Sequence, residues 1–340
     1  MSNLSPVLVG GEALFDLISR DVGSGLGGSR NFEKRAGGSP FNIAVGVRRL
    51  GVPVAFVGKF GVDQFGEALV DFLKNESIDV THVVREPGTK TTVAFVAVDK
   101  ESKPEFRFYR DRAADTSLRE DELTKVQPGV FSIFHCGGIV LAEEPSASAY
   151  ASLADRFVEK RIPVSLDPTV RQSLISDPDR YLSSLSKLIE KVSILKVSDE
   201  ELQFLTGTAD FDEGVKALPA KEGALVFVTL GRAGASVYRD GAKLAHAPGF
   251  AVKAVETTGC GDCFMSAVLA QLAGKSIANL AVIGSAELVS LMRAANAAAA
   301  IVATRVGAAE ANPTRQEVEQ FLAEHCESLA TTPSPHSIPR

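Results

Sequence analysis

The residues best suited to chemistry lie together in one glycine-containing segment late in the chain. Residues 254–264 read Ala-Val-Glu-Thr-Thr-Gly-Cys-Gly-Asp-Cys-Phe, an apolar run that enters a turn, with a helical pattern opening directly behind it. Backbone amides at a helix start are unpaired and lie at the positive end of the helix dipole, so such a turn suits a bound anion. Asp262 would stand in the first helical turn. Its carboxylate could accept a proton from an attacking hydroxyl while the amides stabilise charge on a transferring phosphoryl group.

Other interpretations of this segment are weaker. An aspartate after glycine at a helix start can be a plain N-cap. The segment has neither the Gly-Lys-Ser/Thr of a P-loop nor a dinucleotide-binding fingerprint after the first strand. Cys260 and Cys263 form a C-x-x-C pair, but Cys136, Cys326 and five histidines show no spacing that would complete a zinc site. A redox pair is expected soon after an early strand, so we favour anion binding.

Alternating strand and helix patterns would place this segment at one edge of a sheet. Short apolar runs predict buried strands at Val7-Gly10, Val54-Lys59, Ile133-Cys136, Val164-Leu166, Ser193-Val197, Leu225-Thr229 and Phe250-Val255. Helical patterns lie between them at 40–50, 64–76, 146–159, 178–190, 199–205 and 263–273. This order predicts an α/β fold with a mostly parallel central sheet that binds ligands beyond the carboxyl ends of its strands.

Two stretches interrupt the alternation. Residues 14–35 are glycine-rich, and residues 93–109 alternate apolar and polar side chains, which predicts antiparallel strands outside the main sheet. Together they could form one small cover over the ligand site, or they could be two unrelated hairpins. We therefore expect a single α/β domain over residues 1–326, with lid strands inserted at about 14–35 and 89–112. Residues 327–340, rich in Ser, Thr and Pro, are expected to be a disordered tail.

Composition narrows the setting of the protein. The 340 residues carry a net charge of -6 without a long basic run, which argues against nucleic-acid or anionic-membrane partners. No basic segment precedes the short apolar stretch near the start, as a signal peptide would need. The apolar stretch 294–304 is too short to span a bilayer. We expect a cytoplasmic protein with reduced cysteines.

Two separated motifs carry a family resemblance. Residues 254–264 resemble the second signature of the PfkB/ribokinase family of carbohydrate kinases, usually written D-T-T-G-A-G-D. The first signature is matched by Gly37-Gly38-Ser39-Pro40-Phe41-Asn42, followed by Ala44, Gly51 and Gly61. The resemblance runs from about Val7 to Leu322 and implies a ribokinase-like fold with a small antiparallel β lid.

Further matches point to the fructokinase branch of that family. They are Gly11-Glu12 with Asp16, Phe108-Tyr109-Arg110 with Ala114-Asp115, residues 167–171, residues 196–207, Thr229-Leu230-Gly231 with Gly234, and Asn296. The resemblance implies that Asp262 is the general base and that the amides of Gly259, Cys260 and Gly261 form an anion hole. Implied sugar-binding residues are Asp16, Gly37, Gly38, Asn42, Tyr109, Arg110 and Arg171. Implied ATP-binding residues are Lys196, Ser198, Thr229, Gly231, Gly234 and Asn296, and Glu201 is implied to hold Mg²⁺ through water.

Three departures from the family pattern affect these expectations. Glu256 replaces an aspartate that is associated with a monovalent-cation site, which puts potassium activation in doubt. Cys260 replaces alanine in the anion hole, where a positive helix end could acidify its thiol; alkylation is then expected to inactivate the protein. Thr169 replaces the asparagine of D-P-N-x-R.

Three functions remain open. The resemblance favours ATP-dependent phosphorylation of D-fructose to fructose 6-phosphate. Kinases for 2-keto-3-deoxygluconate share the two glycines and the arginine positions. A sugar-binding regulator without phosphoryl transfer is the alternative of another class. Relatives that dimerise through the lid make a homodimer the expected assembly.

Overall fold

The computed structural model describes residues 4–98 and 104–325, which form a nine-stranded sheet and a separate four-stranded sheet. The large sheet has the order β13-β12-β11-β10-β9-β8-β1-β4-β5. Its strands are β1 (Val7–Gly10), β4 (Val54–Gly61), β5 (Asp79–Glu86), β8 (Ile133–Gly137), β9 (Val164–Asp167), β10 (Ile194–Ser198), β11 (Leu225–Thr229), β12 (Ala235–Arg239) and β13 (Ala242–Ala247). All pairings are parallel except those of β12 with β11 and β13. The predicted α/β class with a mostly parallel sheet is confirmed.

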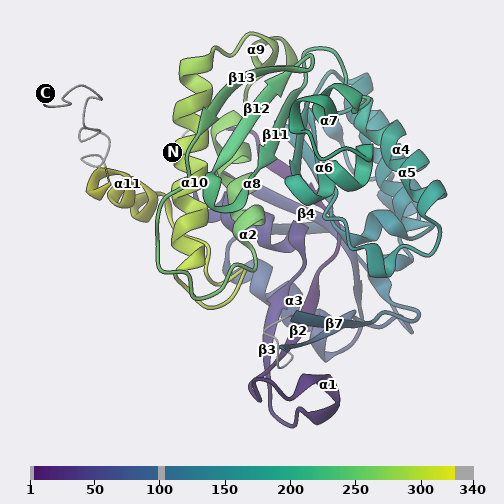
Figure 1. Cartoon of the computed structure of the whole chain (residues 1–340). Coiled ribbons are helices and arrows are strands. Elements are labelled where there is room, and N and C mark those ends of the chain that lie inside the picture. The colour runs from purple at the N-terminus through teal and green to yellow at the C-terminus, as the bar shows by residue number, and fades with distance from the viewer. Residues whose placement is uncertain (1–3, 99–103, 326–340) are drawn as a thin grey trace, which may run out of the picture.

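Helices cover both faces of this sheet (Figure 1). Val7 and Val9 of β1 pack into one core, and Leu8 between them packs into the other, because successive strand residues point to opposite faces. The first core holds α2 (Ser39–Arg49), α3 (Gln64–Asn75), α8 (Cys260–Leu272) and α10 (Ser285–Ala303). The second holds α4 (Ser146–Glu159), α5 (Pro178–Ile189), α6 (Asp199–Thr206) and α7 (Phe211–Ala217). Three further helices are α1 (Gly25–Gly28), α9 (Ile277–Ala281) and α11 (Arg315–Glu324).

The α10 helix is longer than the apolar stretch noted in the sequence. With 19 residues it is the one helix in the described ranges that is long and apolar enough to cross a membrane, and 61% of its apolar window is buried within the protein. A buried helix of this kind is typical of a protein core, because it is apolar on more than one side.

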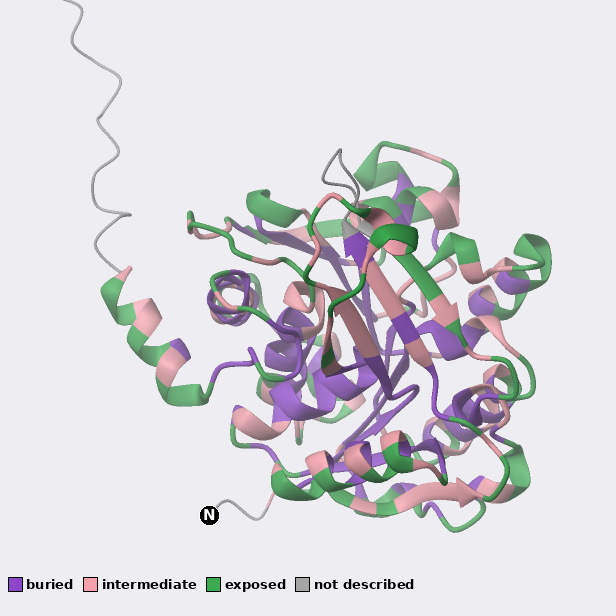
Figure 2. Ribbon diagram, turned by 90° about the horizontal axis from the view of Figure 1, so that it is seen from below, coloured by how far each residue is buried: buried purple, intermediate pink, exposed green. Residues whose placement is uncertain are grey.

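The two interrupting stretches form one small sheet, which we call the lid. Its order is β3-β2-β6-β7, with β2 (Leu14–Ser19), β3 (Phe32–Gly37), β6 (Val93–Val98) and β7 (Pro104–Tyr109). The outer pairings are antiparallel, as expected, but the central pair β2–β6 is parallel. The lid projects from one end of the body (Figure 1), and its strands are mostly exposed or half-buried, in contrast to the buried central sheet (Figure 2).

Several predicted elements differ from the structure. Residues 250–255 form no strand; instead the amide of Val255 donates to the carbonyl of Ala303 at the end of α10, at 2.7 Å. The strands β5, β12 and β13 were not predicted; β5 and β13 form the two edges of the sheet, where residues are mostly half-buried or exposed and the apolar pattern is weak. The expected tail at 327–340 lies outside the described residues.

Candidate active site

The predicted site residues lie where the carboxyl ends of the parallel strands meet the N-termini of α2 and α8, below the lid. Gly259 caps α8 with φ 81°, and a Cβ atom built on it would lie 2.9 Å from the Cβ of Ala308. Only glycine fits such a backbone without strain. In the described chain, the backbone amides of Gly261 and Asp262 have no acceptor, whereas the Cys260 amide donates to the Thr257 carbonyl at 3.2 Å. The free amides at this turn therefore include those of Gly259, Gly261 and Asp262, whereas the Cys260 amide, expected in the anion hole, is already paired.

Both oxygens of the Asp262 carboxylate are held by the first signature. The Ser39 hydroxyl donates to Oδ1 at 2.7 Å, and the Asn42 amide donates to Oδ2 at 2.8 Å. Both donors come from the first turn of α2, which Pro40 at its start preorganises. The Oδ1 atom of Asn42 is buried and has no hydrogen-bond partner in the described part of the chain. The two signatures thus meet at one carboxylate, with an unused acceptor beside it.

Asp16 approaches this group from lid strand β2. Its Oδ2 atom lies 2.4 Å from where a Gly37 Cβ would be, so the glycine leaves room for the carboxylate. Burial, together with the nearby carboxylates of Glu256, Glu310 and Asp262, raises the pKa of Asp16 to about 7, although Arg171 acts in the opposite direction. The charges of Arg171 and Asp262 therefore both act on Asp16.

A buried ammonium group lies on the other side of the α8 N-terminus. The Nζ atom of Lys196 lies 3.1 Å from Asp167 and 3.8 Å from Glu201, and 3.2 Å from where a Gly261 Cβ would be. Burial alone would lower the pKa of Lys196, but the carboxylates of Asp167, Glu201 and Asp262 raise it. Lys196 is thus a fixed positive charge directly beside the free amides of α8.

Glu201 is strongly engaged by the backbone. Its two carboxylate oxygens accept from the amides of Val170 at 2.9 Å and Ser198 at 2.8 Å, and the Ser198 hydroxyl accepts from its amide. Burial works against ionisation, but Lys196 and these amides together keep the pKa of Glu201 below its usual value. Within the described ranges, no group of three or more His, Cys, Asp or Glu residues could hold a metal ion.

The predicted nucleotide residues follow the carboxyl ends of β10 and β11. Ser198 pairs in register with Thr229, and Gly231 has open space where a Cβ would be. Gly234 packs against the backbone of Ala247, and the buried Asn296 donates to the carbonyls of Ala247 and Pro248 at 2.9 and 3.1 Å. Asn296 and Gly234 therefore fix the conformation of the loop at residues 247–249. Thr229 and Gly231 lie at the carboxyl end of β11, with open space beside Gly231.

With this geometry described, comparison with known proteins identifies the family. The sequence matches the pfkB family carbohydrate kinase description over residues 5–315.

The chain belongs to the pfkB family of carbohydrate kinases.

Its relatives cover nearly its whole length. Probable fructokinase-5 of Arabidopsis thaliana is 36% identical over 95% of this chain and 98% of its own. Fructokinase-1 of Zea mays is 36% identical over 92% of this chain and 96% of its own. A fructokinase from Xylella fastidiosa with bound ATP superposes with a TM-score of 0.86, at 30% identity, over 95% of this chain and 99% of its own. A double mutant of Vibrio cholerae fructokinase in a fructose, ADP and potassium ion bound form superposes with a TM-score of 0.82, at 30% identity, over 95% of this chain and all of its own.

Tyr109 and Arg110, both expected at the sugar, make other contacts in the structure, and their binding of sugar stays a prediction. Tyr109 pairs with Val93, on the lid face opposite Asp16, and it is 67% exposed against the ring of Phe95. Arg110 is turned inward onto Asp115 at 3.1 Å, and its Nε and Nη1 atoms have no partner in the described chain. The alternation of side chains along β7 places Phe108, rather than Tyr109, on the face of Asp16.

The Cys260 thiol differs from the expectation of an acidified group. Burial raises its pKa to about 11, and the carboxylates of Asp262 and Glu256 contribute in the same direction. The positive helix end is therefore outweighed by burial, with two nearby negative charges acting in the same direction.

Sequence reasoning also missed partners of the predicted residues. Ser39 lay inside the first signature and Asp167 inside the D-P-T-V-R match, yet neither was assigned a role. Arg35 of lid strand β3 lies 3.4 Å from Glu256, whose carboxylate also accepts from the Gly307 amide at 3.0 Å. The alternation of side chains along β3 could have indicated that Arg35 faces the site. Its partner Glu256, however, is 221 residues away in the sequence.

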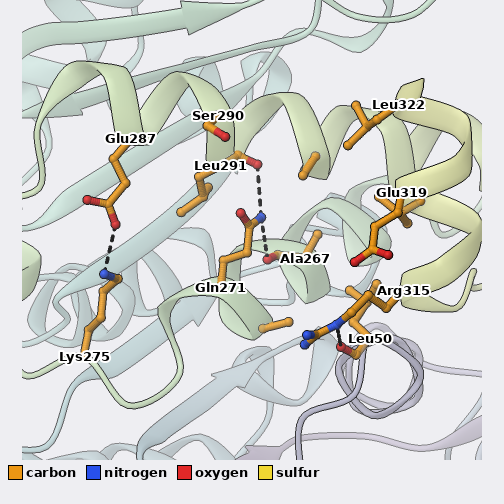
Figure 3. A pocket seen from close by; sticks show the side chains of 13 residues that line it. Leu50, Ala267, Gln271, Lys275, Glu287, Ser290, Leu291, Arg315, Glu319 and Leu322 are labelled. Atoms are coloured by element: carbon orange, nitrogen blue, oxygen red, sulfur yellow. Dashed lines mark hydrogen bonds and ion pairs between the residues drawn. The ribbon is translucent and has the colours of Figure 1, made fainter. Parts of the chain in front are cut away.

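A separate hollow of about 490 Å³ lies between α8, α10 and α11 and is no part of this site. Figure 3 shows its rim, where Lys275 pairs with Glu287 at 2.9 Å and Arg315 donates to the Leu50 carbonyl. Gln271 donates to the carbonyls of Ala267 and Leu291 across its floor. These polar groups are already satisfied by the protein itself.

Proposed function

We propose that this kinase transfers the γ-phosphoryl group of ATP to the C6 hydroxyl of D-fructose, with Asp262 as the general base. The observation that carries the proposal is the placement of Asp262. Its carboxylate is fixed by Ser39 and Asn42 directly beside two free helix amides and the Lys196 ammonium. The relatives named as fructokinases, two of them with bound nucleotide, support fructose and ATP as substrates.

In the proposed mechanism, residues on one side of the α8 N-terminus bind the sugar, and groups on the other side stabilise charge on the phosphoryl group. On the lid side, Asp16 and the unused Oδ1 of Asn42 accept hydrogen bonds from sugar hydroxyls, and Arg171, whose charge acts on Asp16, binds the sugar as well. The attacking hydroxyl gives its proton to Asp262 as the phosphoryl group transfers. The amides of Gly261 and Asp262 and the charge of Lys196 stabilise the negative charge that develops, where no solvent needs to reorganise.

Mg²⁺ fits this arrangement only with phosphate and water as its main ligands. Glu201 already accepts two backbone amides, so it would hold metal-bound water, and the buried Oδ2 of Asp167 lies 3.1 Å from the Lys196 ammonium. When bound with ATP, Mg²⁺ supplies charge neutralisation at the β- and γ-phosphates.

A potassium ion does not fit beside Glu256. That carboxylate is already engaged by the Gly307 amide and by the guanidinium of Arg35. We therefore expect equal rates in potassium and sodium salts at constant ionic strength.

The sugar is tested by product analysis. Purified kinase with Mg²⁺ and ATP is offered fructose, glucose, ribose and 2-keto-3-deoxygluconate separately, and the phosphorylated carbon is located by ³¹P–¹H NMR. Fructose 6-phosphate is expected. Turnover on the keto-acid alone would make 2-keto-3-deoxygluconate the substrate, and fructose binding without turnover on any sugar would favour the regulator.

We further propose a cytoplasmic homodimer joined through the outer face of the lid. That face carries an aromatic cluster of Phe32, Phe95 and Tyr109, with ring centroids 5.2 and 5.4 Å from Phe95. An exposed aromatic cluster on a small sheet is stabilised when a second copy covers it. Light scattering should give twice the chain mass, and Tyr109→Glu should yield a monomer.

A further inference from the structure

The C-x-x-C pair places two thiols around the proposed catalytic aspartate. Cys260 is the first residue of α8 and Cys263 the fourth, so Gly261 and Asp262 lie between them in one turn. Both are free thiols; Cys260 is half-buried and Cys263 is buried. Phosphoryl transfer uses neither sulfur atom, so the function proposed above does not explain the pair.

The two thiols are close enough to bond after a small movement. Residues three apart on a helix have Cβ atoms about 5–6 Å apart, whereas a disulfide needs about 3.5–4.5 Å. The first turn must therefore contract by roughly 1–2 Å.

The backbone around the pair can accommodate this contraction. Gly259 and Gly261 flank Cys260 and permit backbone angles closed to other residues. The contraction acts on the bonds that hold this turn: the amide of Cys263 donates to Gly259 at 2.8 Å and that of Cys260 to Thr257 at 3.2 Å, and Ser39 and Asn42 donate to the Asp262 carboxylate. The atoms that move are the amides of Gly261 and Asp262 and the Asp262 side chain.

We propose that Cys260 and Cys263 form a reversible disulfide that switches the kinase off by distorting the anion hole. The loss of activity rests on the proposed role of Asp262; the disulfide itself does not. With hydrogen peroxide as oxidant, the Cys260 sulfur attacks one peroxide oxygen, the O–O bond breaks and hydroxide leaves, giving a sulfenic acid. The Cys263 sulfur then attacks the Cys260 sulfur and displaces hydroxide. The two thiols lose two electrons and two protons, and the peroxide becomes two water molecules. A dithiol reverses the bond by exchange.

The charges around the pair make this a slow switch at neutral pH. Cys260 faces Asp262 and Glu256, and burial together with these carboxylates raises its pKa to about 11. Cys263 is affected by burial, Cys260 and Asp262, which raise its pKa, and by Arg305, which lowers it. Because the thiolate is the reactive form, the rate should rise about tenfold per pH unit below pH 11. Bound ATP should slow it by covering the turn.

The test compares wild type with Cys263→Ala and, as a matched buried control, Cys136→Ala. Each protein is treated with hydrogen peroxide at pH 8.5, assayed against its own untreated rate, and digested to map the 260–263 peptide by mass spectrometry. We expect wild type and Cys136→Ala to lose at least about tenfold in rate as the disulfide forms, and dithiothreitol to restore it. Cys263→Ala should give no disulfide mass for the 260–263 peptide and should carry Cys260 as an oxyacid instead; Cys263→Ser serves if the alanine variant does not fold.

Each contrary outcome is distinguishable. A fully formed disulfide with unchanged activity would refute the coupling to the anion hole. Oxidation that leaves the 260–263 peptide as two free thiols would refute the pair. If the reduced kinase is inactive on every sugar, the proposed function fails, while the peptide mass still reports on the disulfide.

Discussion

Ser39 and Asn42 restrict the Asp262 carboxylate to one orientation, because one donor reaches each of its oxygens. A carboxylate that is already oriented needs no reorganisation when it accepts a proton, and this favours the transition state over the ground state. The Ser39 hydroxyl comes from a residue 223 positions away in the sequence. It is therefore a positioning residue that acts through Asp262.

Ser39→Ala tests this arrangement. Loss of one hydrogen bond to a charged group should lower kcat about tenfold, with KM for fructose changed less than threefold. Steady-state kinetics measure the split, and Ser39→Thr, which keeps a hydroxyl, is the matched control. An unchanged kcat in the alanine variant would contradict the positioning role.

The ionised carboxylate of Asp16 is expected to bind the sugar but to lower the stability of the folded protein, and this loss of stability depends on pH. Its pKa is raised to about 7 mainly by burial, so between about pH 4 and 7 the folded state keeps a proton that the unfolded state loses, and wild-type stability falls as pH rises. Asp16→Asn should therefore be more stable than wild type by more than about 1 kcal/mol at pH 8. The difference should vanish near pH 4, where both side chains are neutral.

Urea unfolding at pH 4.5 and pH 8, with the fructose KM at pH 8, measures both effects. We expect KM to rise about tenfold in the variant, because an amide offers fewer acceptor sites to a polyol. Equal free energies of unfolding for wild type and Asp16→Asn at pH 8 would show that burying the Asp16 carboxylate does not destabilise the folded protein.

At the scale of single residues, the sequence predicted which residues carry the chemistry better than it predicted their hydrogen-bond and ion-pair partners. Asp262 was predicted from one turn, since glycine, aspartate and a helix start are local features. Ser39, Asp167 and Arg35 act through contacts across the fold, which no local pattern encodes. Motif matching assigned Tyr109 to the sugar without regard to which lid face its position in β7 would take.

The segment that follows strand β9 contains a strained backbone position. Thr169 follows β9 and adopts φ 47°, a left-handed conformation that is unfavourable for a β-branched residue and tolerated by asparagine. Thr169→Asn should therefore raise the free energy of unfolding by about 1 kcal/mol. Thr124→Asn, at a position with φ -59°, is the control. Urea midpoints measure both, and equal changes at the two positions would contradict the strain argument.

Lid strand β3 is tied to the turn before α8 by a single buried contact. Arg35, whose side chain is 11% exposed, reaches both Glu33 and Glu256. Without it the lid should close less completely over the sugar, and water should reach the phosphoryl group more often. Arg35→Ala should raise sugar-independent ATP hydrolysis severalfold relative to transfer.

A coupled assay without sugar measures this hydrolysis. Arg20 is the matched control, because it pairs with the same Glu33 from an exposed position and, in the described part of the chain, does not pair with Glu256. Equal rates of ATP hydrolysis in Arg35→Ala and Arg20→Ala would contradict the proposal that the Arg35–Glu256 contact helps the lid to close.

Predictions at the scale of elements succeeded where a segment is buried on both faces. The apolar runs of β1, β8 and β11 are wholly or almost wholly buried, so burial and periodicity agree. Residues 250–255 have the same apolar composition but run along the surface, held by α10 rather than by a neighbouring strand. Composition alone could not distinguish these two settings.

The whole molecule combines a body whose central sheet is largely buried with a lid that is half exposed (Figure 2). The alternation of strands and helices predicted the body, and the two interruptions predicted the lid. The parallel β2–β6 pairing that joins those interruptions depends on chain paths far apart in sequence. The molecule carries a net charge of -6, yet the buried Lys196 gives its nucleotide side a local positive charge.

The most direct test of the account replaces Asp262 by asparagine, which keeps the shape and removes the proton acceptor. We measure fructose-dependent ATP consumption by Asp262→Asn and fructose affinity by calorimetry. The account predicts a fall in kcat of about a thousandfold, with fructose affinity within about threefold of wild type, because Asp16 and Asn42 still hold the sugar. Turnover within tenfold of wild type would contradict the central claim that Asp262 is the base.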